Sequence, residues 1–237
     1  MLINTKHRID TPEIMDDFEM QGEPLHDALD KISGINHFLG GNKLTLEGVA
    51  NLISNTDSLQ EISIVDLGCG NGDMLRMLAD YGEKNNLKFK LTGIDANPFT
   101  IEYAKELSIS YPNIHYQCED IFGNHVMGLK YDIALLTLTL HHFKDNEIAD
   151  LLETCHKNAN LGIVINDLHR SSIAYRLFQA LCFVLRLNPV SRHDGLASIL
   201  RGFKREELIP LAEKLNCKNY RIQWKWAFRY QWIISKI

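Results

Sequence analysis

Cysteine pairs are absent from this sequence. Its five cysteines are scattered over 237 residues, and no two of them form a C-x-x-C motif. Structural zinc sites and disulfide-rich domains both need closely spaced cysteines, so neither is indicated. We therefore predict no metal site, and a reduced protein of the cytoplasm.

The sequence also lacks segments that would direct it to a membrane or to nucleic acid. Its start, MLINTKHRIDTPEIMDDF, has no apolar core of the kind found in signal peptides. The apolar stretch from Ile173 to Leu187 carries two arginines and is too short and too charged to cross a bilayer. The formal net charge is -5 and no long basic run occurs, which argues against broad binding to nucleic acid. We expect a small-molecule substrate, no nucleic-acid partner and no integral membrane association; the oligomeric state stays open.

The most informative stretch that is present is ISIVDLGCGNGD, residues 62–73. An apolar run from Ile62 to Leu67 ends in turn residues, which is typical of a buried parallel strand. The glycines that follow let the main chain adopt angles closed to other residues, and they let a ligand lie against it. Helical spacing resumes directly afterwards, so the ligand would meet the positive end of a helix. The stretch predicts a nucleotide-like site; a tight turn that binds nothing is the alternative.

The spacing of the glycines separates two known motifs. The dinucleotide fingerprint G-x-G-x-x-G has its third glycine one residue later than it stands here. Residues 65–72, VDLGCGNG, instead resemble the first motif of class I S-adenosylmethionine (SAM)-dependent methyltransferases at every fixed position. This resemblance implies SAM as the cofactor and S-adenosylhomocysteine as its product. It also implies that the cofactor is bound by Asp66, Gly68, Cys69 and Gly70.

A second cofactor motif follows the next predicted strand. The segment FKLTGID ends in Asp95, and ligands of doubly wound sheets bind where the strands end. A carboxylate at that place can accept two hydrogen bonds from a ribose diol, although a lone strand-end acid can also cap a helix. The segment GIDANP resembles the second motif of the same family. The resemblance implies that Asp95 holds the ribose and that Ala96 and Asn97 line the pocket.

The strands after this motif extend the same comparison. Residues 114–118 are expected to form the third strand, and Asp120 and Ile121 follow it. The resemblance implies that Asp120 bonds the adenine amino group and that Ile121 packs on the ring. Leu138, at the end of the fourth strand, completes the expected cofactor set.

The order of the predicted elements indicates the fold class. Apolar runs at 62–67, 89–95, 114–118, 131–138 and 162–167 alternate with helical patterns, which is typical of an α/β protein with a parallel sheet. Residues 220–226 and 229–236 alternate as a hairpin. We predict a Rossmann-like, doubly wound seven-stranded sheet with an antiparallel last strand, plus an N-terminal helical segment. The predicted division is 1–58 as a cap or lid and 59–237 as the methyltransferase domain, with a helical insertion at about 171–200.

The N-terminal segment allows two interpretations. Apolar residues from Leu25 to Phe38 recur at helical spacing, and Gly40 and Gly41 end that pattern. Packing of this segment against the domain is the simpler interpretation. The functional alternative is a lid over the substrate that includes Met15, Phe18 and Met20. The helix within 171–200 is expected to cover the mouth of the site, with a membrane-facing role as the alternative.

Four histidines that lie after the fourth and fifth strands are candidates for acid–base chemistry: His141, His142, His169 and His193. The segment LHHF resembles the motif that follows this strand in quinone-biosynthesis methyltransferases, and it holds His141 and His142. Either histidine could instead cap the next helix. We place the general base at His142 or His193, with Asp167 or Asp194 as the orienting partner, because histidine titrates near neutrality. The RHDG segment around His193 is a solvated loop in the simpler interpretation.

The predicted function is SAM-dependent methyl transfer to a small aromatic, quinol or polyketide-derived acceptor, at oxygen rather than carbon. The segments NDLHR and RHDG resemble a narrower bacterial group linked with aromatic polyketide or quinone-like pathways. No Asn/Asp-Pro-Pro-Tyr or Pro-Cys segment supports methylation of nucleic-acid bases. The main alternative is a SAM-binding regulatory or accessory protein without transferase activity. A nicotinamide dehydrogenase and a protein or RNA methyltransferase are less favoured.

Overall fold

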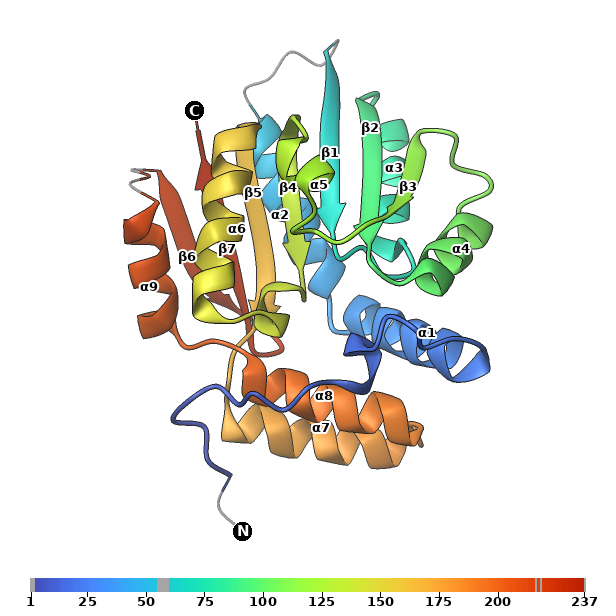
Figure 1. The fold of residues 1–237 in the computed structure, drawn as a ribbon, viewed down its shortest axis with the longest axis vertical. Coiled ribbons are helices and arrows are strands. Elements are labelled where there is room, and N and C mark those ends of the chain that lie inside the picture. Colours follow the sequence, from blue (N-terminus) through green and yellow to red (C-terminus); the bar gives the residue numbers. More distant parts are fainter. Residues whose placement is uncertain (1–2, 55–59, 216, 218, 237) are drawn as a thin grey trace.

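One mixed sheet of seven strands runs through the middle of the molecule (Figure 1). The computed structural model describes residues 3–54, 60–215, 217 and 219–236. The sheet order is β3-β2-β1-β4-β5-β7-β6; β1 to β5 are parallel, and β7 is antiparallel to both of its neighbours. The strands are β1 (Glu61–Leu67), β2 (Lys88–Asp95), β3 (Ile114–Cys118), β4 (Tyr131–Thr137), β5 (Ala159–Leu168), β6 (Tyr220–Lys225) and β7 (Arg229–Ser235). This sheet confirms the predicted fold class.

Helices cover both faces of the sheet. In Figure 1, α2 (Gly41–Ile53) and α3 (Asp73–Lys84) lie behind it, and α6 (Asp145–Asn158) and α9 (Arg205–Lys214) lie in front. Helix α4 (Pro98–Leu107) connects β2 to β3, and the short α5 (Asn124–Gly128) precedes β4. The helix expected directly after the glycine turn is α3. Helices on both faces explain why the central strands are apolar throughout rather than alternating.

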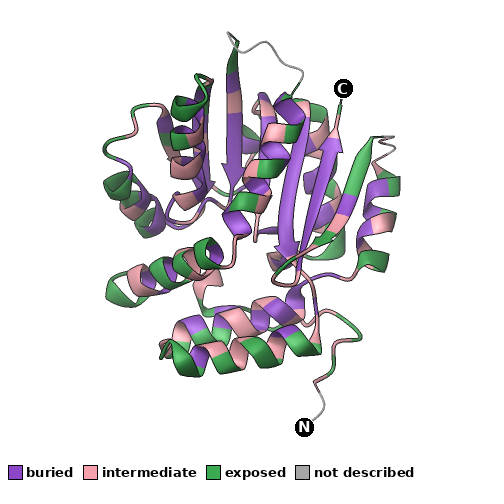
Figure 2. Cartoon of the chain, turned by 180° about the vertical axis from the view of Figure 1, so that it is seen from behind, coloured by how far each residue is buried: buried purple, intermediate pink, exposed green. Residues whose placement is uncertain are grey.

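Each face of the sheet has its own apolar core. In β1, Ile62 and Ile64 pack into the core on the side of α2 and α3, whereas Val65 and Leu67 pack into the core beside α6 and α9. Figure 2 shows the central strands buried, with exposed residues on the outer sides of the helices. The two cores hold the strand ends in a fixed row, and that row positions the glycine turn and the acids that follow it.

A layer of helices lies below the carboxyl ends of the parallel strands (Figure 1). It consists of α1 (Glu23–Phe38), α7 (Ser172–Val184), α8 (Pro189–Arg201) and the short 3-10 turn η1 (Ile14–Asp16). The N-terminal segment crosses α8, where the Ile9 N–H donates to the Leu200 carbonyl oxygen at 3.4 Å. The buried Arg170 also donates to the carbonyl oxygens of Thr5 and Lys6. The predicted division into a cap at 1–58 and a domain with an insertion stays a prediction.

Some local elements differ from the sequence interpretation. The stretch around RHDG is part of helix α8 and not a loop, because Asn188 caps it by accepting the Ser191 N–H at 2.7 Å and Pro189 fits the first turn. The residues after Pro12 form only the short turn η1. A further 3-10 turn, η2 (Leu140–His142), follows β4.

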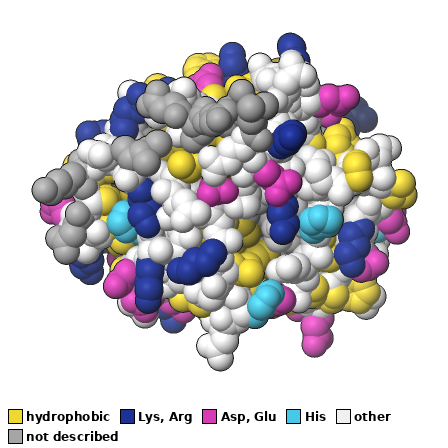
Figure 3. All heavy atoms as spheres, turned by 90° about the horizontal axis from the view of Figure 1, so that it is seen from above, with side chains coloured by type: hydrophobic (Ala, Val, Ile, Leu, Met, Phe, Trp, Pro, Cys, Tyr) yellow, Lys and Arg dark blue, Asp and Glu magenta, His cyan; other side chains and the backbone are white. Residues whose placement is uncertain are grey.

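No helix in the described part of the chain is long and apolar enough to cross a membrane. Figure 3 shows the end of the molecule opposite to α7 and α8, and both basic and acidic side chains lie on it. The candidate site lies at the other end of the sheet, where the helical layer faces the row of strand ends.

Candidate functional site

The glycine turn after β1 holds a carboxylate in place through its backbone. Gly68 and Gly70 have φ angles of 77° and 53°, in the region that favours glycine. The Gly70 N–H donates to Oδ2 of Asp95 at 3.1 Å, and the Asn97 N–H donates to Oδ1 at 3.0 Å. Burial raises the pKa of Asp95, although these N–H groups oppose the shift. Asp95 thus stands fixed at the end of β2, where a ribose-binding acid is predicted.

A second acid, Asp66, is buried next to Asp95, and one of its carboxylate oxygens has no hydrogen-bond donor. Its side-chain Oδ1 is shielded from solvent and has no hydrogen-bond partner. Burial, and secondly the charge of Asp95, raise the pKa of Asp66 to about 7. A buried acceptor without a donor is costly, so this place suits a ligand that brings an N–H, an O–H or a positive charge.

Asn97 has a structural role as well as a place in the site. Its side-chain oxygen caps α4 by accepting the N–H groups of Phe99 and Thr100. Its side-chain nitrogen donates to the Met20 carbonyl oxygen at 2.9 Å, which ties the N-terminal segment to the strand ends. The helix cap that was the alternative role for Asp95 is therefore supplied by Asn97.

One cavity of about 730 Å³ collects the predicted cofactor residues. Pockets of this size are typical of small-molecule sites. In this cavity Asp120 also accepts the N–H of Phe122 at 2.9 Å, and Leu138 has a φ of 57°. All ten predicted residues line it: Asp66, Gly68, Cys69, Gly70, Asp95, Ala96, Asn97, Asp120, Ile121 and Leu138. Whether they bind a cofactor stays a prediction.

His141 lies buried between two carboxylates. Its Nδ1 is 2.7 Å from Oδ1 of Asp167, and its Nε2 is 3.5 Å from Oε1 of Glu13. Burial lowers the pKa of His141, but the charge and hydrogen bond of Asp167, together with Glu13, outweigh it and raise the pKa to about 9. Burial raises the pKa of Glu13, while the neighbouring His141 and the charges of both histidines lower it overall. Asp167 therefore pairs with His141, and not with His142 or His193 as predicted, because η2 turns His141 back onto β5.

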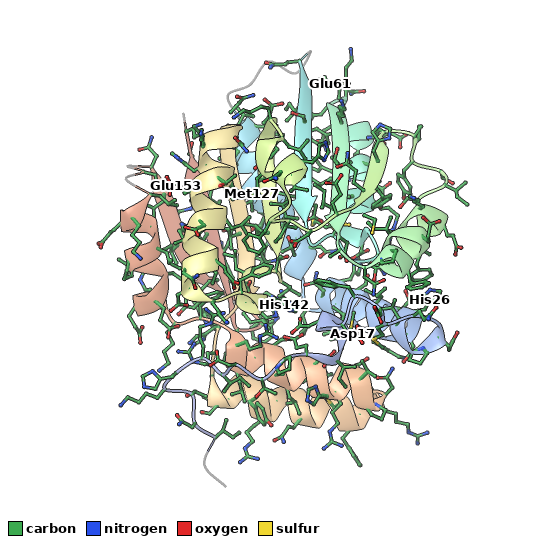
Figure 4. All side chains as sticks on the ribbon, viewed as in Figure 1. Asp17, His26, Glu61, Met127, His142 and Glu153 are labelled. Atoms are coloured by element: carbon green, nitrogen blue, oxygen red, sulfur yellow. The ribbon has the colours of Figure 1, made fainter. Side chains whose placement is uncertain are left out.

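His142 has a different carboxylate partner, and it comes from the N-terminal segment. Its Nδ1 is 2.6 Å from Oδ1 of Asp16, and the other Asp16 oxygen accepts from Nη1 of Arg201 at 2.6 Å. Burial raises the pKa of Asp16, but the hydrogen bonds from His142 and Arg201 reverse this and leave it well below its usual range. Arg201 also donates to the carbonyl oxygens of both histidines. In Figure 4, His142 lies between the lower end of the sheet and the helical layer.

The remaining candidate, His193, takes no part in this arrangement. It bonds to Asp194 at 2.8 Å as predicted, but its ring is not among the described residues that line the cavity. Asp194 accepts the N–H groups of Ile14 and Met15 at 2.7 and 3.0 Å. Asp194 thus holds the N-terminal segment, and the catalytic role of His193 stays a prediction that the geometry does not favour.

Sequence reasoning missed three residues that meet at the histidine pair: Glu13, Asp16 and Arg201. Glu13, His141 and His142 each offer one ligand atom, and these atoms lie within 4.8 Å of one another. In the part of the chain that the structure describes, this group could hold a metal ion, whereas the sequence predicts no metal site. Sequence spacing could not reveal that the N-terminal segment meets the histidine pair, because the residues in contact, such as Asp16 and His142, are 126 positions apart.

Comparisons with known proteins agree with this geometry. Residues 64–162 match the family model described as a methyltransferase domain. The chain is 32% identical over 89 residues to malonyl-[acyl-carrier protein] O-methyltransferase of Acetivibrio thermocellus, covering 38% of the chain and 29% of that protein. It is 27% identical over 167 residues to ubiquinone biosynthesis O-methyltransferase of Rickettsia felis, covering 68% and 64%. The chain thus spans less than two thirds of the length of these curated relatives.

Solved structures show the same fold. The plantazolicin methyltransferase BamL, in complex with S-adenosylhomocysteine, has a TM-score of 0.67 at 16% identity, covering 88% of this chain and 90% of that one. Magnesium protoporphyrin IX methyltransferase (ChlM) of Synechocystis PCC 6803 has a TM-score of 0.54 at 14% identity, covering 83% and 84%. Residues 64–162 of the chain thus match the methyltransferase-domain family, and the solved structures share the predicted fold.

Proposed function

We propose that this chain is an enzyme that transfers a methyl group from SAM to an oxygen atom of a small aromatic, quinol or polyketide-derived acceptor. The observation that carries the proposal is that ten predicted cofactor residues and the pair His141–His142 line one cavity. Holding two reactants in one cavity supplies much of the acceleration of a transfer reaction, on the order of 7–11 kcal/mol. The two curated relatives described above are O-methyltransferases, which supports transfer to oxygen.

The residues of the cavity fit the cofactor. Asp95, held by two backbone N–H groups, would accept the ribose hydroxyls. Asp66, with its buried oxygen that lacks a donor, suits the positively charged part of SAM. Asp120 and Ile121 would hold the adenine. Bound SAM supplies a methyl group on a sulfonium, open to attack from the side opposite the sulfur.

The rest of the cavity wall suits an apolar acceptor. Leu177, Phe178 and Leu181 of α7 line it, as do Trp226 and Phe228 from the turn between β6 and β7. Such a wall excludes water and packs against the apolar part of a flat or branched acceptor. The polar group of the acceptor is then left facing the polar part of the cavity. The apolar wall therefore supports a small organic acceptor over a nucleic acid.

His142 is the proposed proton acceptor. When its Nδ1–H donates to Asp16, the lone pair of the neutral ring lies on Nε2. A phenol, with a pKa near 10 as in tyrosine, must lose its proton as its oxygen attacks the methyl group. The Asp16 carboxylate fixes the tautomer and stabilises the imidazolium that forms, as the acid of a catalytic triad does. His141, oriented by Asp167, is the second candidate.

The N-terminal segment is the proposed lid. Met15 and Phe18 line the cavity, and the backbone of Ile14 and Met15 is held by Asp194 on α8. A segment fixed in this way would exclude water from the transfer site. We also propose a cytoplasmic location, which the five free cysteines support because thiols stay reduced there.

A regulatory SAM-binding protein would need the glycine turn and Asp95, but it would not need two histidines that each have a buried or half-buried carboxylate partner.

The proposal is tested by incubating the protein with methyl-labelled SAM and a panel of phenols, quinols and carboxylic acids. We expect labelled product with at least one hydroxyl acceptor, and loss of at least 10-fold in rate for His142→Gln but not for the surface variant His125→Gln. SAM binding without transfer to any acceptor would favour the regulatory alternative.

A further inference from the structure

Two buried polar atoms face each other beside the transfer site, and neither has a hydrogen-bond partner. They are Oε1 of Glu13 and Nε2 of His141, which lie 3.5 Å apart. Both side chains are more than nine-tenths buried and both line the cavity. Two ligands held about 2.1 Å from one tetrahedral metal ion stand roughly 3.4 Å apart. The separation of the two atoms is therefore that of two ligands sharing an ion.

His142 is the third residue of the same cluster. Its Nδ1 is 4.0 Å from Oε1 of Glu13, and one ligand atom from each of the three residues lies within 4.8 Å of the others. Because Nδ1 already bonds Asp16, the free Nε2 would be the ligand. The remaining positions around an ion would face the cavity. Three protein ligands with an open position are typical of catalytic rather than structural metal sites.

Outer carboxylates orient both imidazoles. Asp167 binds Nδ1 of His141 at 2.7 Å, and Asp16 binds Nδ1 of His142 at 2.6 Å. In metal sites, a ligating histidine commonly donates its other N–H to a carboxylate, which fixes the ring and raises its basicity. Both histidines of this chain have that partner already in place.

The charges of the group also favour a divalent cation. The carboxylates of Glu13, Asp16 and Asp167 contribute three negative charges. Arg201 contributes one positive charge, with Nη1 2.6 Å from Asp16 and 3.5 Å from Glu13. With both imidazoles neutral, as metal ligands must be, these groups sum to a net charge of about -2, which a divalent ion would balance in this poorly solvated place.

We propose that Glu13, His141 and His142 bind one divalent transition-metal ion of the Zn²⁺ type at the acceptor end of the cavity. Two imidazoles and one carboxylate are a ligand set that suits Zn²⁺, Co²⁺ or Fe²⁺, whereas Mg²⁺ prefers oxygen ligands and water. The ion stays divalent throughout and takes up no electrons from the reaction.

The inference rests on the proposed function for its chemical consequence. The acceptor hydroxyl would coordinate the ion at the open position and release its proton to water, since a bound metal ion lowers the pKa of such a group. The oxygen lone pair then forms the O–CH₃ bond while the C–S bond breaks and its electron pair returns to sulfur. The ion would replace free imidazole as the activating group, and His142 would be a ligand instead of the base.

The test uses the full chain without a histidine tag, stripped with a chelator and then titrated with Zn²⁺ and with Co²⁺. We expect one equivalent of Zn²⁺ by calorimetry and visible Co²⁺ absorption typical of four or five nitrogen and oxygen ligands. Glu13→Gln should weaken Zn²⁺ binding by at least about 10-fold, and Asp167→Asn by about 10- to 100-fold. The matched control is His125→Gln, whose exposed ring also has a carboxylate partner, at 3.0 Å from Glu119; it should bind Zn²⁺ like the wild type.

A SAM titration of the same samples separates this inference from the proposed function. Absence of stoichiometric Zn²⁺ binding in a protein that binds SAM would overturn the metal site and leave the proposed function standing. Equal Zn²⁺ binding by Glu13→Gln, or a full transfer rate in chelator, would overturn it too. A rate that falls on chelation and returns with Zn²⁺ or Co²⁺ supports it. Zn²⁺ binding that depends on Glu13 in a chain that binds no SAM keeps the metal site and removes the proposed function.

Discussion

Nδ1 of His142 lies 2.6 Å from Oδ1 of Asp16, although the two residues are 126 positions apart in the chain. The contact joins the turn after β4 to the N-terminal segment, and Arg201 of α8 holds the other oxygen of the same carboxylate. The geometry of His142 therefore depends on a segment outside the residues 64–162 that match the methyltransferase domain.

Asp16→Asn tests this dependence. The amide cannot orient and polarise the His142 ring as the carboxylate does, so we expect the methyl-transfer rate constant to fall by about 10- to 100-fold while SAM affinity changes little. The measurement is single-turnover transfer at saturating SAM. Asp17→Asn is the control, because Asp17 is exposed and its side chain accepts only a local bond from the Glu19 N–H among the described contacts. Equal rates in both variants would remove Asp16 from the mechanism.

His142→Gln and His193→Gln separate the two histidines that the sequence offers as general base. His142 lines the cavity, whereas His193 does not belong to its described lining. We expect His193→Gln to transfer methyl groups within about twofold of the wild-type rate, and His142→Gln to lose at least 10-fold. A large loss in His193→Gln with normal SAM binding would restore His193 as the base.

Asp66→Asn should change how stability depends on pH. The folded-state pKa of Asp66 is raised to about 7 from 3.8, so the folded protein binds more protons than the unfolded chain between these values. Stability contributed by this group is therefore lost as pH rises from about 4 to 7, by up to about 1.4 kcal/mol per pH unit. We expect Asp66→Asn to raise the melting temperature of the ligand-free protein at pH 8 more than at pH 5. An equal effect at both pH values would contradict the raised pKa.

Gly68→Ala tests the geometry of the glycine turn. Gly68 has a φ of 77°, and a Cβ there would lie 2.8 Å from the Thr139 side chain. We expect a loss on the order of 1–3 kcal/mol in the free energy of unfolding, measured by urea denaturation. Gly34→Ala in α1 is the matched control, since a Cβ there meets no atom within 4 Å. That variant should gain roughly 0.5–1 kcal/mol, because alanine favours a helix; the same loss in both would reject the steric argument.

The sequence predicts those parts of the fold and the site that depend on residues close together in the chain. The strand, glycine turn and helix at 62–84 and the acid at Asp95 could be predicted because short spacing sets them. The antiparallel end of the sheet followed from the alternation of residues 220–236. All ten cofactor candidates line one cavity for the same reason: parallel strands end at one edge of the sheet.

The partners of the histidines could not be predicted in the same way. Asp167 was expected beside His142 or His193, but the turn η2 places His141 against it instead. Glu13 and Asp16 reach the site because the N-terminal segment is held in place by other parts of the fold, among them Asp194 and Arg201 of α8. Such contacts depend on tertiary packing, which leaves no periodic signal in the sequence.

The central claim, that this cavity binds SAM through Asp95, is tested most directly by calorimetric titration of SAM and S-adenosylhomocysteine. We expect the wild type and Asp150→Ala, a control on the exposed face of α6, to bind both with the same affinity. Asp95→Ala should bind at least about 100-fold more weakly, because it loses two hydrogen bonds to a charged group. Tight binding that is equal in all three proteins would contradict the account of the cofactor site.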